Sequence, residues 1–524
     1  MSENVKISKA TGIMSLATGL SRVAGLARDI VVAGLFGAGF ATDAFFMAFT
    51  IPNLLRRFFA EGSLTASFVP TYSEIFHLQG EEEADRIANI CWTLLLLTMA
   101  AVTILGIVGS PLVVGGIASG FGAVEGKLAL TNALNMVMFP YIALVSLLAL
   151  LTGILNVRGH FFLPSLSPLF LNLSMILCGW FLSSRLGIPI MSLAIGVLIG
   201  GVLQLLMQYP ILRHMGIRLR LDFNFRDAAV MKIARLMLPG IAGVAIYQIN
   251  VVVTRLLASF LPEGSVSYLY YGQRLFEFPQ GIFIVSLAQA VLPSMSRQAS
   301  RDDMEGLRSS LRFALSLILL VTLPAMIGLV LCATPIYSLF FMGGAFGAEE
   351  VEKTAMALAA YAPGLLFVGI SRVVVPTFYA LKNTRTPVWI AFWTLLVNGL
   401  LGILLMGPLA HLGLAMALTL SSVFNSIALV WALRSKIGPL GLAALLSSLF
   451  KLVPAAVLMA LFVQGTLSLI EWDLEGHKFL KGMVLGGAVL GGGGIYALVC
   501  WLLRVPEATE AAALFRKKLF RRRE

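Results

Sequence analysis

Residues 314–333 read ALSLILLVTLPAMIGLVLCA, a stretch of twenty residues without a charged side chain. As an α-helix this stretch would be about 30 Å long, which is the thickness of the hydrocarbon core of a bilayer. Similar runs recur along the chain, so that 58% of its 524 residues are hydrophobic and only 12% are charged. A soluble protein could not bury this much apolar surface. We therefore expect an all-α polytopic membrane protein without large soluble domains.

Apolar runs bounded by charges or by Gly and Pro clusters predict about fourteen transmembrane helices. The expected ranges are 9–36, 40–70, 89–116, 126–154, 162–183, 188–212, 233–260, 266–296, 310–340, 351–381, 386–407, 411–433, 440–470 and 479–503. Alternate threading places about 25 loop cations on one side of the membrane and about five on the other. The richer side is expected to be cytoplasmic, with both termini there. The net charge of +12 is thus a topology signal, and we expect no nucleic-acid partner.

Prolines at matching places predict an internal repeat with an offset of 223 residues. The matching pairs are Pro70 with Pro293, Pro140 with Pro363, and Pro164 with Pro387. This offset corresponds to six helices, an even number, so the two repeats should have the same orientation in the membrane. Two parallel six-helix repeats facing each other would enclose a central cavity that can open to either side, the architecture of alternating access.

The repeat divides the chain into four expected parts. These are an N-lobe at 1–225, a C-lobe at 226–437, two additional helices at 438–505, and a basic cytoplasmic tail at 506–524. The two additional helices lie outside the repeat, and the tail lies outside the membrane.

Ionisable residues inside predicted spans are the candidate functional residues, because a charge in the membrane is costly unless it faces a cavity or a partner. The first predicted helix carries Arg22, Arg28 and Asp29. Arg22 and Asp29 are seven residues apart, so they share one helix face.

The second predicted helix begins with Asp43 and carries Asn53 and Arg56. The eighth carries Arg274 near the middle of the membrane, with Glu277 one turn away. Guanidinium groups in a low-dielectric cavity suit a phosphate or pyrophosphate better than a neutral or cationic ligand. We therefore expect a cationic central cavity built for an anion.

Some charges have simpler explanations. Arg57, Arg255 and Arg372 lie where their side chains could extend to the membrane surface. Asp43 could serve only as the N-cap of its helix. The sequence leaves these alternatives open, whereas Arg22, Arg28, Arg56 and Arg274 favour a functional role.

Several motifs resemble the MurJ (MviN) family of lipid II flippases, in the multidrug/oligosaccharidyl-lipid/polysaccharide (MOP) exporter superfamily. They are SRVAGLARD at 21–29, FGAG at 36–39, TDAF at 42–45, IPNLLRRFFAEG at 51–62, YYGQRL at 270–275 and KNTRTP at 382–387. The resemblance implies a multi-pass protein of the bacterial inner membrane, not an enzyme, that moves the undecaprenyl-pyrophosphate-linked peptidoglycan precursor to the outer leaflet.

The same resemblance assigns roles to parts of the chain. It places Arg22, Arg28, Arg56 and Arg274 among cavity arginines that bind substrate, with Asp29 and Asp43 in the same motifs. It implies that the last two helices form a groove for the lipid tail, although the Gly-rich run in 486–494 would equally suit close helix packing. Lipid II and membrane lipids are the expected partners of a monomeric protein, and no cofactor or metal is expected.

Thr254 departs from that family's pattern, since many relatives have an aspartate there that is linked to sodium. Asn383 likewise stands where an aspartate is common. These departures argue against sodium coupling and favour the membrane potential acting on the cavity arginines, which is worth about 2.3 kcal/mol per charge moved through 100 mV.

Three alternatives to the lipid II flippase function remain open. A multidrug exporter would share the fold, but it needs carboxylates to meet cationic substrates. A flippase for polyprenyl-linked polysaccharide units would use the same anion chemistry, and only the motifs separate it. A membrane glycosyltransferase or polymerase would be expected to carry acid/base carboxylates on a sizeable outer loop, whereas the outer loops here are short.

Overall fold

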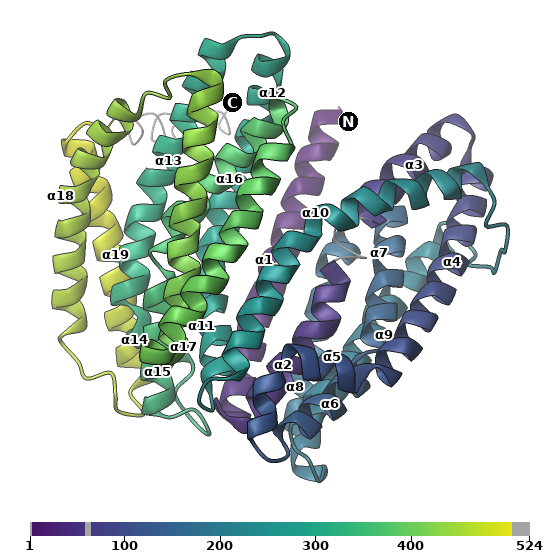
Figure 1. The fold of residues 1–524 in the computed structure, drawn as a ribbon, viewed down its shortest axis with the longest axis horizontal. Helices are drawn as coiled ribbons and strands as arrows, with labels where there is room; N and C mark the ends of the chain where they lie inside the picture. Colours follow the sequence, from purple (N-terminus) through teal and green to yellow (C-terminus); the bar gives the residue numbers. More distant parts are fainter. Residues whose placement is uncertain (1–2, 58–63, 506–524) are drawn as a thin grey trace. The chain divides into compact units, whose positions relative to one another are not determined.

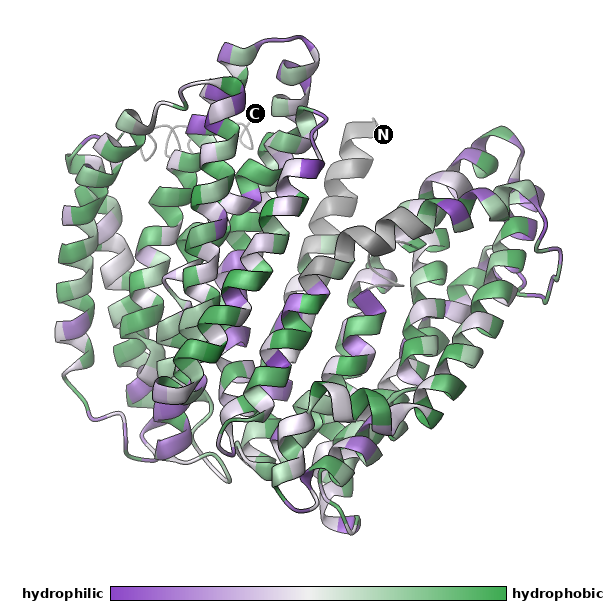
Figure 2. Cartoon of the chain, viewed as in Figure 1, coloured by the Kyte–Doolittle hydropathy of each residue, from purple (hydrophilic) through white to green (hydrophobic). Residues whose placement is uncertain are grey.

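A computed structural model of the chain describes residues 3–57 and 64–505, and over these ranges it is helical and contains no β-strand. Long helices run side by side, joined by short connections (Figure 1). Figure 2 shows that most residues along the helices are hydrophobic and that hydrophilic residues are frequent in the connections. The expected all-α membrane fold is confirmed. Glu61 of the IPNLLRRFFAEG motif and the expected tail at 506–524 lie outside the described residues.

The helices that precede residue 260 are α1 (Glu3–Phe36), α2 (Phe40–Arg56), α3 (Thr65–Leu78), α4 (Glu81–Val108), α5 (Ser110–Ile117), η2 (Ser119–Ala123), α6 (Lys127–Met138), α7 (Tyr141–Val157), α8 (Phe162–Leu182), η3 (Ser183–Arg185), α9 (Met191–His214) and α10 (Ala228–Ser259). The following ones are α11 (Ser265–Pro279), the π-helical η4 (Gln280–Ile284), α12 (Val285–Ser300), α13 (Met304–Leu331), α14 (Ala333–Phe340), α15 (Ala348–Tyr361), α16 (Gly364–Ala380), α17 (Arg385–Ile437), α18 (Leu442–Leu467) and α19 (Lys478–Leu502).

Nine helical segments of the described chain are long and apolar enough to span a membrane, or ten if the bent pair α15 and α16 counts as one span. One of the nine is α17, in which Ala410 has a non-helical backbone (φ 48°, ψ −129°). A Cβ on Gly413 would lie 2.2 Å from the carbonyl oxygen of Leu405, so the chain folds back on itself here. α17 is therefore a hairpin of two helices, as the separate ranges 386–407 and 411–433 predicted. The total of fourteen stays a prediction.

The helix bounds confirm the internal repeat. α4 and α13 begin and end at positions that differ by 223 residues, and so do α5 and α14, and α7 and α16. The prolines that indicated the repeat occupy equivalent places, since Pro140 is the N-cap of α7 and Pro363 is the N-cap of α16. Each half of the chain therefore builds the same succession of helices.

The chain also forms two compact units, Met1–Ser267 (unit 1) and Tyr268–Glu524 (unit 2). By the repeat offset α10 is the counterpart of α1, yet it packs against α3, α4, α5 and η2 and so belongs to unit 1. The repeat in the sequence therefore begins its second copy with α10, whereas the packing of the helices places α10 in the first unit. The expected lobe boundary at residue 225 stays a prediction.

Small residues set the packing of the helices that carry the first candidate arginines. α8 packs against both α9 and α1. A Cβ on Gly196 would lie 2.9 Å from Cα of Met175, and a Cβ on Gly200 would lie 2.8 Å from Cα of Leu171. These contacts leave no room for a larger side chain, so the two glycines fix the distance between α8 and α9. Through α8, they also fix the wall against which α1 packs.

In unit 2, α18 and α19 pack against each other and against α13. A Cβ on Gly491 would lie 2.5 Å from the Phe462 ring, and one on Gly492 would lie 2.6 Å from Val463. These two glycines serve close helix packing. By contrast, Gly486 and Gly493 have open space where a Cβ would be, as do Gly487 and Gly494. The glycine-rich run therefore has a packed face and an open face, and only the open face is available to a lipid chain.

Candidate functional site

Arg28 and Asp29, near the C-terminal end of α1, form a buried ion pair. Arg28 donates to Oδ1 of Asp29 from both Nε (3.0 Å) and Nη2 (2.6 Å). The two side chains are only 7% and 1% exposed. Nη1 of Arg28 lies 3.9 Å from the sulfur of Met175 on α8. A buried cation is tolerated only when its charge is balanced, and Asp29 supplies that balance while fixing the orientation of the guanidinium.

Arg22 lies two turns earlier on α1 and is half-buried. Next to it, the carbonyl oxygen of Ser21 accepts a hydrogen bond from Nδ2 of Asn172 on α8 (3.3 Å). Gly25, between Arg22 and Arg28, is buried. α8 therefore supports the segment of α1 that carries both arginines.

Asp43 in α2 is enclosed by donors from the protein. Its Oδ2 accepts from Nζ of Lys127 (2.9 Å) and from the backbone amide of Gly264 (2.8 Å). Its Oδ1 accepts from the backbone amide (2.9 Å) and the hydroxyl (2.7 Å) of Ser267. Four donors fill the acceptor positions of a carboxylate. Asp43 thus joins α2, α6 and the start of α11, and its place in the structure is that of a structural anchor.

The alternative that Asp43 is the N-cap of its helix is wrong. The N-cap is Gly39, whose amide donates to Oγ1 of Thr42 (2.8 Å). Lys127 is only 2% exposed and lies 4.4 Å from the ring centroid of Phe121. No local pattern marks Lys127, because its partner is 84 residues away.

Asn53 and Arg56 are brought together at the end of α2. Nε of Arg56 donates to Oδ1 of Asn53 (3.0 Å), and both side chains are partly buried. Pro52 lies inside the same helix. A neutral amide therefore helps to orient Arg56, in contrast to the carboxylate that orients Arg28.

Arg274 and Glu277 lie on α11 in unit 2, and both are half-buried. Oε1 of Glu277 accepts from Nε2 of Gln273 (3.3 Å). Pro279, the last residue of α11, is followed by a π-helical turn at Gln280–Ile284. Such turns widen a helix locally and often mark functional sites.

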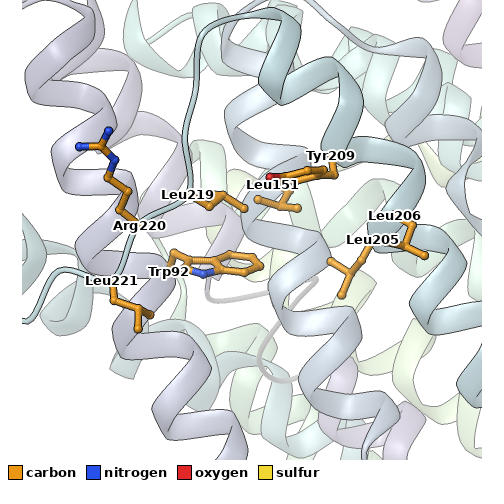
Figure 3. Close-up of a pocket in the computed structure, with 8 residues that line it drawn as sticks. All are labelled: Trp92, Leu151, Leu205, Leu206, Tyr209, Leu219, Arg220 and Leu221. Atoms are coloured by element: carbon orange, nitrogen blue, oxygen red, sulfur yellow. The ribbon is translucent and has the colours of Figure 1, made fainter.

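A cavity of about 400 Å³ in unit 1 differs in character from the expected cationic cavity. Figure 3 shows its lining: the apolar side chains lie together, whereas Arg220 directs its guanidinium away from them. The lining residues are Trp92, Leu151, Leu205, Leu206, Tyr209, Leu219, Arg220 and Leu221. This pocket contains none of the candidate substrate-binding residues.

Long apolar helices, an internal repeat of helices and buried or half-buried arginines define the protein as a polytopic membrane transporter. Comparison with solved structures supports the fold. The chain is similar to a MATE-family multidrug transporter of the MOP superfamily in an inward-facing conformation, with a TM-score of 0.67 over 80% of this chain and 95% of that one. At 16% identity this likeness shows the fold alone.

The chain belongs to the family described as "Lipid II flippase MurJ", whose sequence model matches residues 32–483. It is 38% identical to a probable lipid II flippase MurJ of Vibrio cholerae, over 80% of this chain and 81% of that protein. It is 34% identical to the lipid II flippase MurJ of Burkholderia cenocepacia, over 80% and 82%. A solved structure of lipid II flippase MurJ in an inward closed conformation has a TM-score of 0.75 and 28% identity, and the match covers 97% and 99% of the two chains.

Proposed function

We propose that this protein flips lipid II from the inner to the outer leaflet of the bacterial inner membrane. The observation that carries the proposal is the family match over residues 32–483, together with relatives whose names give that activity. The fold agrees with it, since a repeat of like helices is the framework of alternating-access transporters.

The arginines are the proposed contact with the pyrophosphate of the substrate. Guanidinium forks bind phosphate oxygens in pairs and are therefore more selective for them than ammonium groups. Arg28 and Arg56 are already oriented by Asp29 and Asn53. An oriented fork loses less side-chain entropy when it binds, so these neighbours act as positioning residues for the arginines.

Alternating access is the proposed mechanism. The two repeats expose the arginines first to the cytoplasm and then to the outside, and bound pyrophosphate lowers the repulsion between cations during closure. The polyprenyl tail stays in the lipid beside α18 and α19, where the open face of the glycine-rich run leaves room.

The membrane potential is the proposed driving force. Thr254 and Asn383 are uncharged, so neither supplies a carboxylate for sodium. Asn383 has a local role, since its Nδ2 donates to Oγ1 of Thr386 (2.8 Å) and its Oδ1 accepts from the amide of Thr386 (3.3 Å) at the start of α17.

This driving force is open to a direct test. In a functional variant without the four native cysteines, a cysteine at Ala24 should change its labelling by a membrane-impermeant thiol reagent when the potential is collapsed. Unchanged labelling would argue against a potential-driven cycle and for an ion as the driver.

Depletion of the protein in its host tests the function itself. We expect lipid II to accumulate in the inner leaflet, and its outer-leaflet fraction to recover on re-expression. An unchanged leaflet distribution would contradict the proposal, and accumulation of a polyprenyl-linked polysaccharide unit in its place would favour the related flippase activity.

A further inference from the structure

One end of each repeat is a corner where three helices meet, and the corner in unit 1 is held by a compensated arginine. Arg158, the C-cap of α7, pairs with Asp85 on α4 and lies 3.6 Å from a carboxylate oxygen of Glu81. Its Nε donates to the hydroxyl of Tyr72 (3.1 Å), and its Nη1 donates to the carbonyl oxygen of Met215, just after α9 (3.5 Å). One cation here faces two carboxylates.

The repeat offset of 223 residues identifies the same corner in unit 2, formed by the start of α13 and the ends of α16 and α17. Three of its positions carry different chemistry: Met304 stands for Glu81, Arg308 for Asp85, and Leu381 for Arg158. The unit 2 corner therefore has no carboxylate at either of these positions. Its arginine lies on α13, whereas the arginine of the unit 1 corner lies at the end of α7.

Arg308 joins this corner in a different way. Its Nε donates to the carbonyl oxygen of Ile437, at the C-terminus of α17 (2.5 Å). Gly438 has φ +83°, and a Cβ built on it would lie 3.1 Å from Nη2 of Arg308, so the glycine lets the guanidinium approach the backbone. Among the described residues, Nη1 and Nη2 have no protein acceptor, and no carboxylate oxygen lies within 4.0 Å of Arg308 or Lys436.

A cavity of about 450 Å³ occupies this corner. It is lined by Met304, Arg308, Leu381, Lys436, Ile437 and Gly438. Arg308 and Lys436 are its charged groups, and the other lining side chains, those of Met304, Leu381 and Ile437, are apolar. The distribution of loop cations predicts that this end of the helices is cytoplasmic.

The excess of Lys and Arg in cytoplasmic loops explains why cations lie at this end of the helices. It does not explain why Arg308 and Lys436 have no carboxylate beside them in the described part of the chain, whereas Arg158 in the unit 1 corner has two. We propose that the corner of Arg308 and Lys436 binds a phosphate-bearing anion, either the headgroup of an anionic phospholipid or free phosphate. Such a group accepts charge-assisted hydrogen bonds from the guanidinium nitrogens and from the ammonium group. This site is separate from the proposed lipid II site and does not depend on that function.

The primary test compares Lys436→Gln with Arg434→Gln in the full chain. Both residues are exposed in the last turn of α17, but only Lys436 lines the cavity. Binding of dioleoyl phosphatidylglycerol, with dioleoyl phosphatidylcholine as the neutral comparison, is measured by native mass spectrometry in a neutral detergent. A parallel arm measures binding of inorganic phosphate.

We expect Lys436→Gln to weaken anion binding by about tenfold while Arg434→Gln has little effect. A loss confined to phosphatidylglycerol identifies the headgroup as the source, and a loss confined to inorganic phosphate identifies the free anion. Equal binding by the two variants in both arms would overturn the proposal.

A second variant, Met304→Glu, restores the residue of the unit 1 corner. Met304 is the first residue of α13, where an acidic side chain is favourable, so the variant should fold. We expect the new carboxylate to pair with Arg308. Met304→Glu should therefore weaken binding of the anion whose binding Lys436→Gln also weakens. Unchanged binding by Met304→Glu in a folded protein would also contradict the proposed site.

Discussion

Nη2 of Arg28 lies 2.6 Å from Oδ1 of Asp29, and this ion pair is almost entirely buried within unit 1. Asp29 therefore has two effects on Arg28. It balances a charge that the apolar surroundings would otherwise not tolerate, and it occupies part of the guanidinium that the substrate would use. A pyrophosphate that reaches Arg28 must compete with Asp29, so binding and release are expected to depend on both residues.

Asp29→Asn should destabilise the protein, because it leaves the Arg28 charge buried without its counter-ion. Removing one partner of a buried pair costs about 3–5 kcal/mol, which should lower the thermal unfolding midpoint in detergent. The double variant Arg28→Met/Asp29→Leu should recover much of that stability but should not flip lipid II. Flipping by the folded double variant would show that the pair is only structural.

Arg28→Lys and Arg274→Lys should each impair flipping although the charge is kept, since an ammonium group lacks the planar fork of a guanidinium. The corresponding alanine variants should be worse. Complementation of a depleted host at normal expression measures the effect. Arg434→Lys, at an exposed position, is the matched control, and Arg255→Ala should be mild. Full complementation by Arg28→Ala would refute the assignment.

Asp43→Asn and Lys127→Met should lower stability and leave substrate recognition intact in the molecules that fold. The reason is that Asp43 is saturated by donors from Lys127, Gly264 and Ser267. Each variant should reduce the thermal unfolding midpoint, whereas the lipid II dissociation constant of the folded fraction should stay unchanged. A weakened affinity without a loss of stability would instead assign Asp43 to the binding site.

Asp227 should make the protein sensitive to acid. Burial raises the pKa of this carboxyl, but hydrogen bonds from Arg86 (2.6 Å) and from the amide of Ala229 (2.9 Å) outweigh it and hold the pKa below its ordinary value. Ionised Asp227 therefore stabilises the start of α10 above the unfolded-state pKa of about 3.9, and this contribution is lost as the pH falls through the lower folded-state pKa.

The measurement for Asp227 is the thermal unfolding midpoint against pH, for wild type and for Asp227→Asn. The two midpoints should differ by a constant amount above about pH 5 and should converge below about pH 4. A difference that does not change over this range would show that Asp227 makes no pH-dependent contribution.

The repeat could be predicted from the sequence because prolines mark fixed places in helices. Pro140 and Pro363 both precede a helix of 17 residues, so their offset gives the register of the whole duplication. The membership of α10 in unit 1 could not be predicted, because it depends on long-range contacts with α3, α4, α5 and η2.

The candidate site was only partly predictable. Helix periodicity places Arg22 and Asp29 on one face, whereas neighbours such as Arg28 and Asp29 point about 100° apart around a helix. The long Arg28 side chain bends back to its neighbour, and backbone geometry alone does not indicate this contact. The same holds for Lys127, whose burial depends on the distant Asp43.

The most direct measurement of the central claim is transbilayer movement of labelled lipid II in liposomes that contain the purified protein under a membrane potential. The fraction of lipid II that a membrane-impermeant reagent can modify is followed over time. Wild type and Arg434→Gln should move lipid II faster than protein-free liposomes, and Arg28→Ala should match the protein-free rate. Wild-type movement no faster than in protein-free liposomes, or Arg28→Ala as fast as wild type, would contradict lipid II flipping through arginine recognition.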